Sequence, residues 1–230
     1  MPTRIAVLAS GDGSNLQAIL DHLERGAAAR AGEVALVASD RADAGALVRA
    51  RDRDIGAVAM DRALRSSGLA SLLAAHDIEL VVLAGYLRFV PADVTRTFRG
   101  RILNIHPGLL PAFGGPGMFG HNVHEAVIAR GARISGATVH FVDEEYDHGP
   151  IVAQWPVPVW PHDTATTLAE RVLQVEHQLY PRVVQRVCEG LISLGADGVV
   201  REEMPASPSA HFILAGPAGN IATHIHVTVP

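Results

Sequence analysis

The sequence predicts an α/β fold with a doubly wound, mostly parallel β-sheet and an antiparallel C-terminal portion. In the first half of the chain, short apolar runs rich in Val, Ile and Leu alternate with helix-like stretches. Such continuous runs are typical of strands covered on both faces. Later, residues 136–143 and 150–159 predict two strands joined by an acidic turn, which gives the antiparallel portion.

The elements of the parallel part follow one another with short connections. Parallel strands linked by crossover helices have their carboxyl ends at one edge of the sheet, where such folds bind ligands. We expect strands at residues 4–9, 33–39, 57–60, 80–84 and 101–105, and helices at residues 14–25, 42–53, 69–76 and 91–97.

The remainder of the chain has a different pattern. Residues 106–121 are rich in Pro and Gly and predict a long loop. Residues 164–188 predict a long amphipathic helix with Asp163 as its N-cap, and Pro181 predicts a kink or a break inside it. Residues 191–230 are expected to be a C-terminal extension of unknown role, with a linker at 205–209 and a weak strand at 223–229.

Composition narrows the class of protein. The chain has 230 residues, 19 of them basic and 24 acidic, and no long basic run, so nucleic acid is not expected as a partner. The single cysteine, Cys188, cannot form an internal disulfide, which fits a reducing compartment. No stretch approaches 18 apolar residues, and the run at 5–9 is too short for a signal peptide. We therefore expect a cytoplasmic protein without a membrane span, either monomer or homodimer.

A glycine-rich turn, Ser10-Gly-Asp-Gly-Ser-Asn, lies between the first strand and the first helix. Glycines allow close approach of an anion, and the helix N-terminus offers free N–H groups and a positive dipole end. The spacing matches neither the dinucleotide motif nor the P-loop, so a single phosphate is the better hypothesis. A plain capped turn explains the segment equally well.

Three polar residues are candidates for catalysis. Asn104 and His106 end a buried strand, and side chains two positions apart point to the same face. An amide beside an imidazole can stabilise an oxyanion and move a proton. Asp147, in a turn, would raise the pKa of His106 and orient its ring if the two were close. Each of these residues, taken alone, is more typical of a structural role.

Together, these segments resemble the phosphoribosylglycinamide formyltransferase family. The resemblance covers about residues 4–189, and a segment of the last helix, Val175-Glu-His-Gln-Leu-Tyr-Pro, matches as well. Four motifs occur in the family's order: Ser10-Gly-Asp-Gly-Ser-Asn-Leu-Gln, Val81-Val-Leu-Ala-Gly-Tyr-Leu-Arg, Leu103-Asn-Ile-His-Pro-Gly-Leu-Leu-Pro, and Gly136-Ala-Thr-Val-His-Phe-Val-Asp followed by Tyr146-Asp-His-Gly-Pro-Ile.

The resemblance implies a Rossmann-like formyltransferase fold over residues 1–190, with a phosphate-binding N-terminal half and a folate-binding, catalytic C-terminal half. It implies transfer of a formyl group from 10-formyltetrahydrofolate to the amine of glycinamide ribonucleotide in purine synthesis. Asn104 and protonated His106 would stabilise the oxyanion, and Asp147 would keep His106 charged. No metal is expected, because the folate carries its carbon at the right oxidation level.

The resemblance also implies substrate contacts. The phosphate would lie against Gly13, Ser14 and Asn15, and Glu176 would bind the ribose hydroxyls. The folate pocket would be lined by Leu87, Arg88, Phe89, Val90 and Asn104, with Arg62 or the nearby Arg65 facing the folate.

Two features depart from the family pattern. Gly108 stands where Ser is usual, and residues 113–124 replace a shorter segment, so the contacts of this loop are open. Met118 and Phe119 in this loop are candidates for an apolar lid. His121 and His124 have a spacing that metal ligands can have, but packing or capping is the preferred interpretation.

Three alternatives are weighed against the transferase. A formyltetrahydrofolate deformylase usually carries an N-terminal regulatory domain and has little use for a phosphate turn. A methionyl-tRNA formyltransferase needs a C-terminal RNA-binding domain, for which the tail is too short and too poor in basic residues. A non-catalytic folate- or nucleotide-binding module would have no need for all three polar residues.

Overall fold

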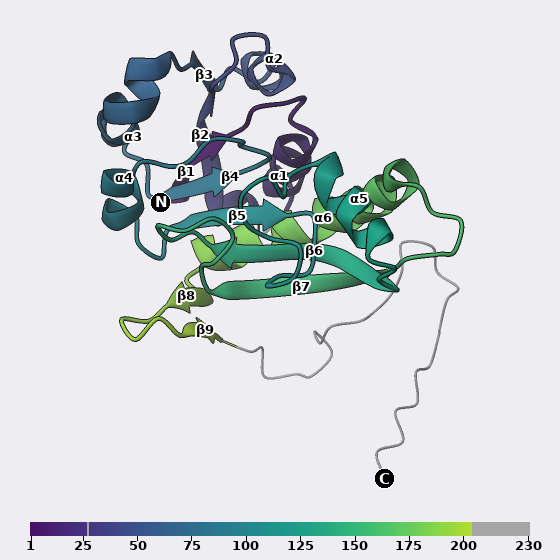
Figure 1. Ribbon diagram of the computed structural model, residues 1–230. Helices are drawn as coiled ribbons and strands as arrows, with labels where there is room; N and C mark the ends of the chain where they lie inside the picture. Colours follow the sequence, from purple (N-terminus) through teal and green to yellow (C-terminus); the bar gives the residue numbers. More distant parts are fainter. Residues whose placement is uncertain (27, 204–230) are drawn as a thin grey trace.

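A mixed β-sheet lies at the centre of the protein, and the computed structural model describes residues 1–26 and 28–203 (Figure 1). The strands follow the order β3-β2-β1-β4-β5-β6-β7 in space. The first five in this order pair in parallel, and the last two pairings are antiparallel, which confirms the predicted fold class. The strands are β1 (Thr3–Leu8), β2 (Gly32–Ser39), β3 (Gly56–Ala59), β4 (Leu80–Leu83), β5 (Ile102–His106), β6 (Ile134–Phe141) and β7 (Ile151–Pro158).

Helices cover both faces of the sheet because successive strand residues point to opposite sides. Ile5 and Val7 of β1 belong to one apolar cluster, and Ala6 and Leu8 belong to another. The first cluster includes residues of α1, α2, α5 and α6, and the second includes residues of α3 and α4. The helices are α1 (Ser14–Leu23), α2 (Gly45–Arg51), α3 (Leu69–Ala75), α4 (Ala92–Thr97), α5 (His121–Ala129) and α6 (Ala165–Cys188), with a 3-10 turn at Ala28–Arg30 and a π-helical segment at Leu64–Gly68.

Helix α6 differs from the prediction at two points. Its N-cap is Thr164, which forms a capping box with Thr167, so the assignment of Asp163 as N-cap was wrong. Asp163 instead accepts hydrogen bonds from the guanidinium of Arg171 at 2.7 and 2.8 Å, and this pairing draws it away from the helix end. The helix also continues through Pro181, so the predicted break does not occur, and a kink stays a prediction. Pro181 is buried among residues of the core, and the packing of a long buried face outweighs one missing backbone hydrogen bond.

A short hairpin that the sequence did not predict follows α6. It consists of β8 (Ile192–Leu194) and β9 (Val200–Glu202), which pair antiparallel. Ile192 is buried in the same apolar cluster as α6. The linker and strand predicted at 205–209 and 223–229 lie outside the described residues.

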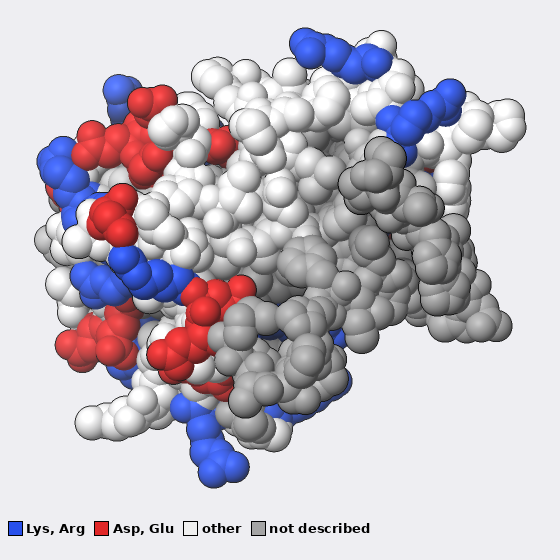
Figure 2. Space-filling model, turned by 90° about the horizontal axis from the view of Figure 1, so that it is seen from below, with Lys and Arg blue, Asp and Glu red and all other residues white. Residues whose placement is uncertain are grey.

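Charged side chains are mixed on the face of the molecule shown in Figure 2. Basic and acidic groups lie next to one another at one side of this face, and uncharged residues occupy its upper centre. No helix within residues 1–26 and 28–203 is long and apolar enough to cross a membrane.

Candidate active site

A cavity of about 670 Å³ lies at the carboxyl ends of β4 and β5. This is the edge at which a doubly wound sheet is expected to bind ligands. The loop after β4, the loop before α5, the turn between β6 and β7, and one face of α6 enclose it. The candidate residues that line the cavity are Asn15, Leu87, Arg88, Phe89, Val90, Asn104, His106, Asp147 and Glu176.

Asn104 and His106 both face this cavity, as the alternation along β5 predicted. The side chain of Asn104 contacts His140 of the neighbouring strand β6, with 3.1 Å between Asn104 Nδ2 and His140 Nε2. The two residues are direct partners in the antiparallel register of β5 and β6. His140 Nδ1 donates a hydrogen bond of 2.9 Å to the carbonyl oxygen of Phe141.

His106 is the last residue of β5 and is 2% exposed. Its Nε2 donates to the carbonyl oxygen of Phe113 at 2.9 Å, and its Nδ1 lies 3.5 Å from Oδ2 of Asp147. The same carboxylate oxygen accepts a hydrogen bond of 2.9 Å from the backbone N–H of Gly115. The loop before α5 is therefore tied to both His106 and Asp147.

Two opposing effects act on the charge state of His106. Burial lowers the pKa of His106, and this effect outweighs the neighbouring carboxylate of Asp147 and the carbonyl of Phe113, which act in the opposite direction. Burial therefore favours the neutral imidazole at rest, while Asp147 favours the charged form, as expected. A charged His106 during the reaction stays a prediction. Because Nε2 carries the hydrogen that Phe113 accepts, Nδ1 is the nitrogen that can take up a proton, and it faces Asp147.

The backbone of Asp147 is left-handed, with φ of 54°. Asp tolerates this conformation better than most residues, and non-glycine residues held in it often lie at functional sites. The turn aims the carboxylate back at β5 and β6, since its other oxygen, Oδ1, lies 3.8 Å from His140 Nε2. Asp147 is thus placed between two buried histidines.

The glycine-rich turn borders the other end of the cavity. Gly13 is the N-cap of α1 with φ of 82°, and a Cβ there would come within 2.8 Å of Ala46. Asn15 donates a 2.7 Å hydrogen bond to Glu176, which is 6% exposed. Burial raises the pKa of Glu176 to about 7, and the hydrogen bond from Asn15 opposes that rise only in part. Ser14 lines an adjacent groove on the outer side of α1.

Apolar side chains dominate the opposite end. Leu87 and Phe89 are partly exposed at the cavity, and the ring of Phe89 packs edge-on against Tyr146 at 5.1 Å between centroids. Arg88 is held by a 2.7 Å hydrogen bond from its Nε to the buried carboxylate of Asp40.

The structure does not bring Arg62 to the cavity. Arg62 is exposed, and neither it nor Arg65 is among the residues that line the cavity. Arg65 is linked to the cavity only indirectly. Its Nη1 lies 3.7 Å from the carboxylate of Asp40, which also pairs with the cavity residue Arg88. Contact of either arginine with a folate stays a prediction.

Sequence reasoning missed two residues of this site, His140 and Tyr146. The signal for His140 was present: Thr138 and His140 alternate with apolar residues in the second half of β6, so both point to one side. The loop of residues 113–124 does border the cavity, where Met118 and Phe119 contribute to the wall. Among residues 1–26 and 28–203, no group of three or more His, Cys, Asp or Glu side chains is arranged to hold a metal ion.

Comparison with known proteins identifies the family. The family model described as formyl transferase matches residues 3–184. A phosphoribosylglycinamide formyltransferase of Haemophilus influenzae is 39% identical over 197 residues, covering 83% of this chain and 90% of the relative. The chloroplastic phosphoribosylglycinamide formyltransferase of Vigna unguiculata is 44% identical over 202 residues, covering 85% of this chain, which spans 64% of that relative's length.

Solved structures agree with the sequence relatives. Glycinamide ribonucleotide transformylase 1 from Symbiobacterium toebii matches with a TM-score of 0.79 and 42% identity, covering 87% of this chain and 94% of that one. A formyltetrahydrofolate deformylase from Pseudomonas syringae matches with a TM-score of 0.77 but only 24% identity, which shows a shared fold alone. The chain therefore belongs to the formyl transferase family and, within it, to the phosphoribosylglycinamide formyltransferases.

Proposed function

We propose that this protein transfers the formyl group of 10-formyltetrahydrofolate to the amine of 5'-phosphoribosylglycinamide, a step of purine biosynthesis. One observation carries the proposal. A single cavity joins an apolar end at Leu87 and Phe89, a polar centre at Asn104 and His106, and a buried acidic end at Glu176. This order suits a pterin, a reacting formyl group and a ribose.

The reaction begins when the amine nitrogen of the ribonucleotide attacks the formyl carbon and forms a new C–N bond. The formyl oxygen gains negative charge, and the free N–H of the Asn104 amide stabilises it. The bond from the formyl carbon to the folate nitrogen then breaks. The proton lost by the attacking amine reaches that nitrogen through His106 or through water.

The His106–Asp147 pair serves the proton transfer. A neutral imidazole accepts a proton at Nδ1, where Asp147 Oδ2 lies 3.5 Å away and stabilises the resulting positive charge. Nε2 is occupied by the carbonyl of Phe113 in this structure, so direct donation from Nε2 to the substrate requires that carbonyl to move away.

Glu176 binds the ribose hydroxyls, and Gly13, Ser14 and Asn15 at the N-terminal turn of α1 bind the phosphate. Of these four residues, Asn15 and Glu176 line the cavity. The apolar end from Leu87 to Val90 binds the pterin, with Arg88 beside it. The compartment and the oligomeric state stay predictions, cytoplasmic and monomer or homodimer; the relative from Vigna unguiculata is named chloroplastic.

The test is formation of tetrahydrofolate from 10-formyltetrahydrofolate with and without glycinamide ribonucleotide. The proposal expects turnover only when the ribonucleotide is present, and formylated ribonucleotide as the second product. Equal turnover without the ribonucleotide would show a deformylase, and folate binding without turnover would show a binding module.

A further inference from the structure

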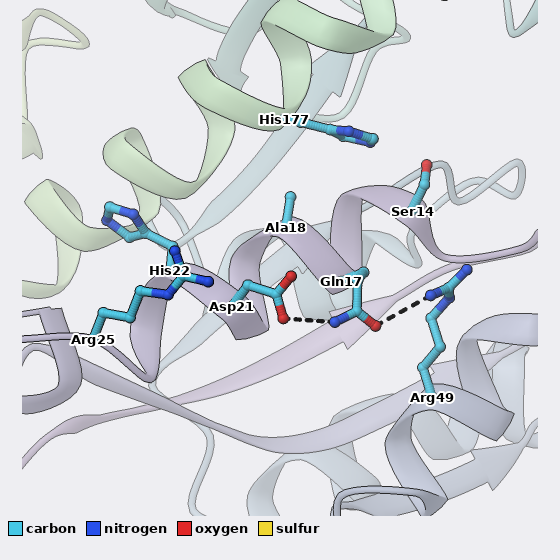
Figure 3. Close-up of a pocket in the computed structure, with 8 residues that line it drawn as sticks. All are labelled: Ser14, Gln17, Ala18, Asp21, His22, Arg25, Arg49 and His177. Atoms are coloured by element: carbon cyan, nitrogen blue, oxygen red, sulfur yellow. Dashed lines mark hydrogen bonds between the residues drawn. The ribbon is translucent and has the colours of Figure 1, made fainter.

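The groove on the outer side of α1, which Ser14 lines, has a volume of about 440 Å³ (Figure 3). Ser14 at the start of α1, Arg49 of α2 and His177 of α6 contribute to its wall. Ser14 and Asn15 are consecutive, and they face this groove and the main cavity respectively. Neighbouring residues at the N-terminal turn of α1 thus line the groove and the cavity.

The turn before α1 carries a charge that opposes its proposed role. Asp12 lies between the two glycines, and its side chain is largely exposed. A phosphate bound at the N-terminus of α1 would lie close to this carboxylate and be repelled by it. A phosphate site at this turn therefore needs a compensating positive charge.

Arg49 supplies that charge with a defined geometry. Its Nη2 lies 2.6 Å from Asp12 Oδ2, and its Nε donates to the backbone carbonyl of Asp12 at 2.8 Å. Nη1 donates to Gln17 Oε1 at 3.1 Å, a contact visible in Figure 3. The guanidinium is thus fixed by both Asp12 and α1, while its side chain keeps 31% exposure at the groove.

Helix α2 packs directly on the turn and holds Arg49 there. The backbone N–H of Ala46 donates to the carbonyl of Gly11 at 3.2 Å. The close approach of Ala46 to Gly13 explains why no side chain fits at that position. Arg49 follows Ala46 by three residues, one turn further along the same face of α2.

A separate feature marks this end of the cavity as a ligand site. Asn15 is only 8% exposed and lines the cavity, yet its Oδ1 has no hydrogen-bond partner within the described part of the chain. Buried polar atoms are normally paired, so this unpaired acceptor at the cavity suggests that a donor of the ligand, such as a ribose hydroxyl, completes it.

We propose that Arg49 is a positioning residue for the phosphate of the ribonucleotide. By pairing with Asp12 it cancels the negative charge of the turn and so favours binding of the phosphate. The inference rests on the proposed function for the identity of the substrate. The Asp12–Arg49 pair sets the affinity of this turn for a ribose phosphate.

The experiment measures binding of ribose 5-phosphate by calorimetry to the wild type, Arg49→Met, Asp12→Asn and the double variant. Arg49→Met leaves the Asp12 charge uncompensated beside the phosphate, and we expect affinity to fall about five- to tenfold at low salt. The loss should shrink as salt is raised, because the charges are near the surface. Asp12→Asn in the Arg49→Met background should restore most of the affinity.

Arg53→Met is the matched control. Arg53 also links the end of α2 to α1, through Asp21 and Glu24 at 3.2 Å, but it does not touch the turn. This variant should bind ribose 5-phosphate like the wild type. Melting temperatures of all variants check that the fold is retained.

The proposal is overturned if Arg49→Met binds as tightly as Arg53→Met, or if Asp12→Asn fails to restore binding to Arg49→Met. In transfer assays Arg49→Met should raise KM for the ribonucleotide while leaving kcat and KM for the folate unchanged, and Arg53→Met should leave all three unchanged. If the variants bind ribose 5-phosphate in the expected order but the wild type does not transfer a formyl group, the proposed function is refuted and the role of the pair is supported.

Discussion

His140 Nε2 lies 3.1 Å from Nδ2 of Asn104, while Nδ1 of the same ring is bonded to the carbonyl oxygen of Phe141. A carbonyl only accepts hydrogen bonds, so Nδ1 must carry the proton. In the neutral ring Nε2 is then an acceptor, and the Asn104 amide donates one of its two N–H groups to it. The orientation of the amide is fixed by this contact, and its second N–H is left for the formyl oxygen.

Replacing His140 tests this chain of hydrogen bonds. His140→Leu removes the acceptor, so the Asn104 amide can rotate and present its oxygen to the developing oxyanion. We expect kcat to fall about tenfold, which is less than the loss seen when an oxyanion donor is removed altogether. His140→Gln offers a carbonyl acceptor and should retain more activity than the leucine variant. Equal rates for the leucine variant and the wild type would contradict the assignment.

The pH dependence of His140 provides a second check. Burial lowers the pKa of His140, and the charge of His106 acts in the same direction, whereas the Phe141 carbonyl, Asp147 and Asp143 oppose this. Because the pKa is lowered, the ring stays neutral as the pH falls through the ordinary histidine value of about 6.5. Activity at low pH should therefore persist below that value in the wild type, and kcat measured against pH shows whether it does.

Glu176 predicts a pH dependence of substrate binding. With its pKa raised to about 7 by burial, the carboxylate is ionised above that pH and protonated below it. An ionised carboxylate is the stronger acceptor for ribose hydroxyls. KM for the ribonucleotide should therefore rise as the pH falls through about 7, whereas KM for the folate should not. In Glu176→Gln this dependence should disappear; if the variant retains it, another group is responsible.

Tyr180 predicts an effect on stability. Its buried hydroxyl lies 3.0 Å from the carbonyl oxygens of both Leu83 and Leu103, so it links the end of β4 to β5 at the residue directly before Asn104. Tyr180→Phe leaves these buried carbonyls with one donor fewer and should cost about 1–2 kcal/mol of unfolding free energy. Urea unfolding measures this, and an unchanged midpoint would show that the hydroxyl contributes nothing.

The sequence predicted what depends on local pattern. Continuous apolar runs such as residues 80–84 indicated covered strands, and the alternation in residues 104–106 placed Asn104 and His106 on one side of β5. Both features are local, so they can be predicted without knowledge of the tertiary structure. The match of the family motifs then indicated the reaction.

Other features depend on packing that the sequence does not display. The pKa of His106 is lowered because the effect of burying the ring outweighs that of the nearby Asp147 carboxylate. The N-cap of α6 is Thr164 and not the predicted Asp163, because the Asp163 carboxylate pairs with Arg171 two turns further along the helix. The role of His140 depends on its pairing with Asn104. The two residues are 36 positions apart in the sequence, and the antiparallel register of β5 and β6 places them opposite each other.

The most direct test of the mechanism compares formyl transfer by the wild type and Asp147→Asn across a range of pH. The asparagine has nearly the same shape but cannot stabilise a positive charge on His106 when Nδ1 takes up a proton. We predict that kcat falls about 10²- to 10³-fold, within the usual contribution of acid–base catalysis, with little change in KM for the folate. A variant that keeps near-wild-type kcat at every pH would contradict the role of the His106–Asp147 pair.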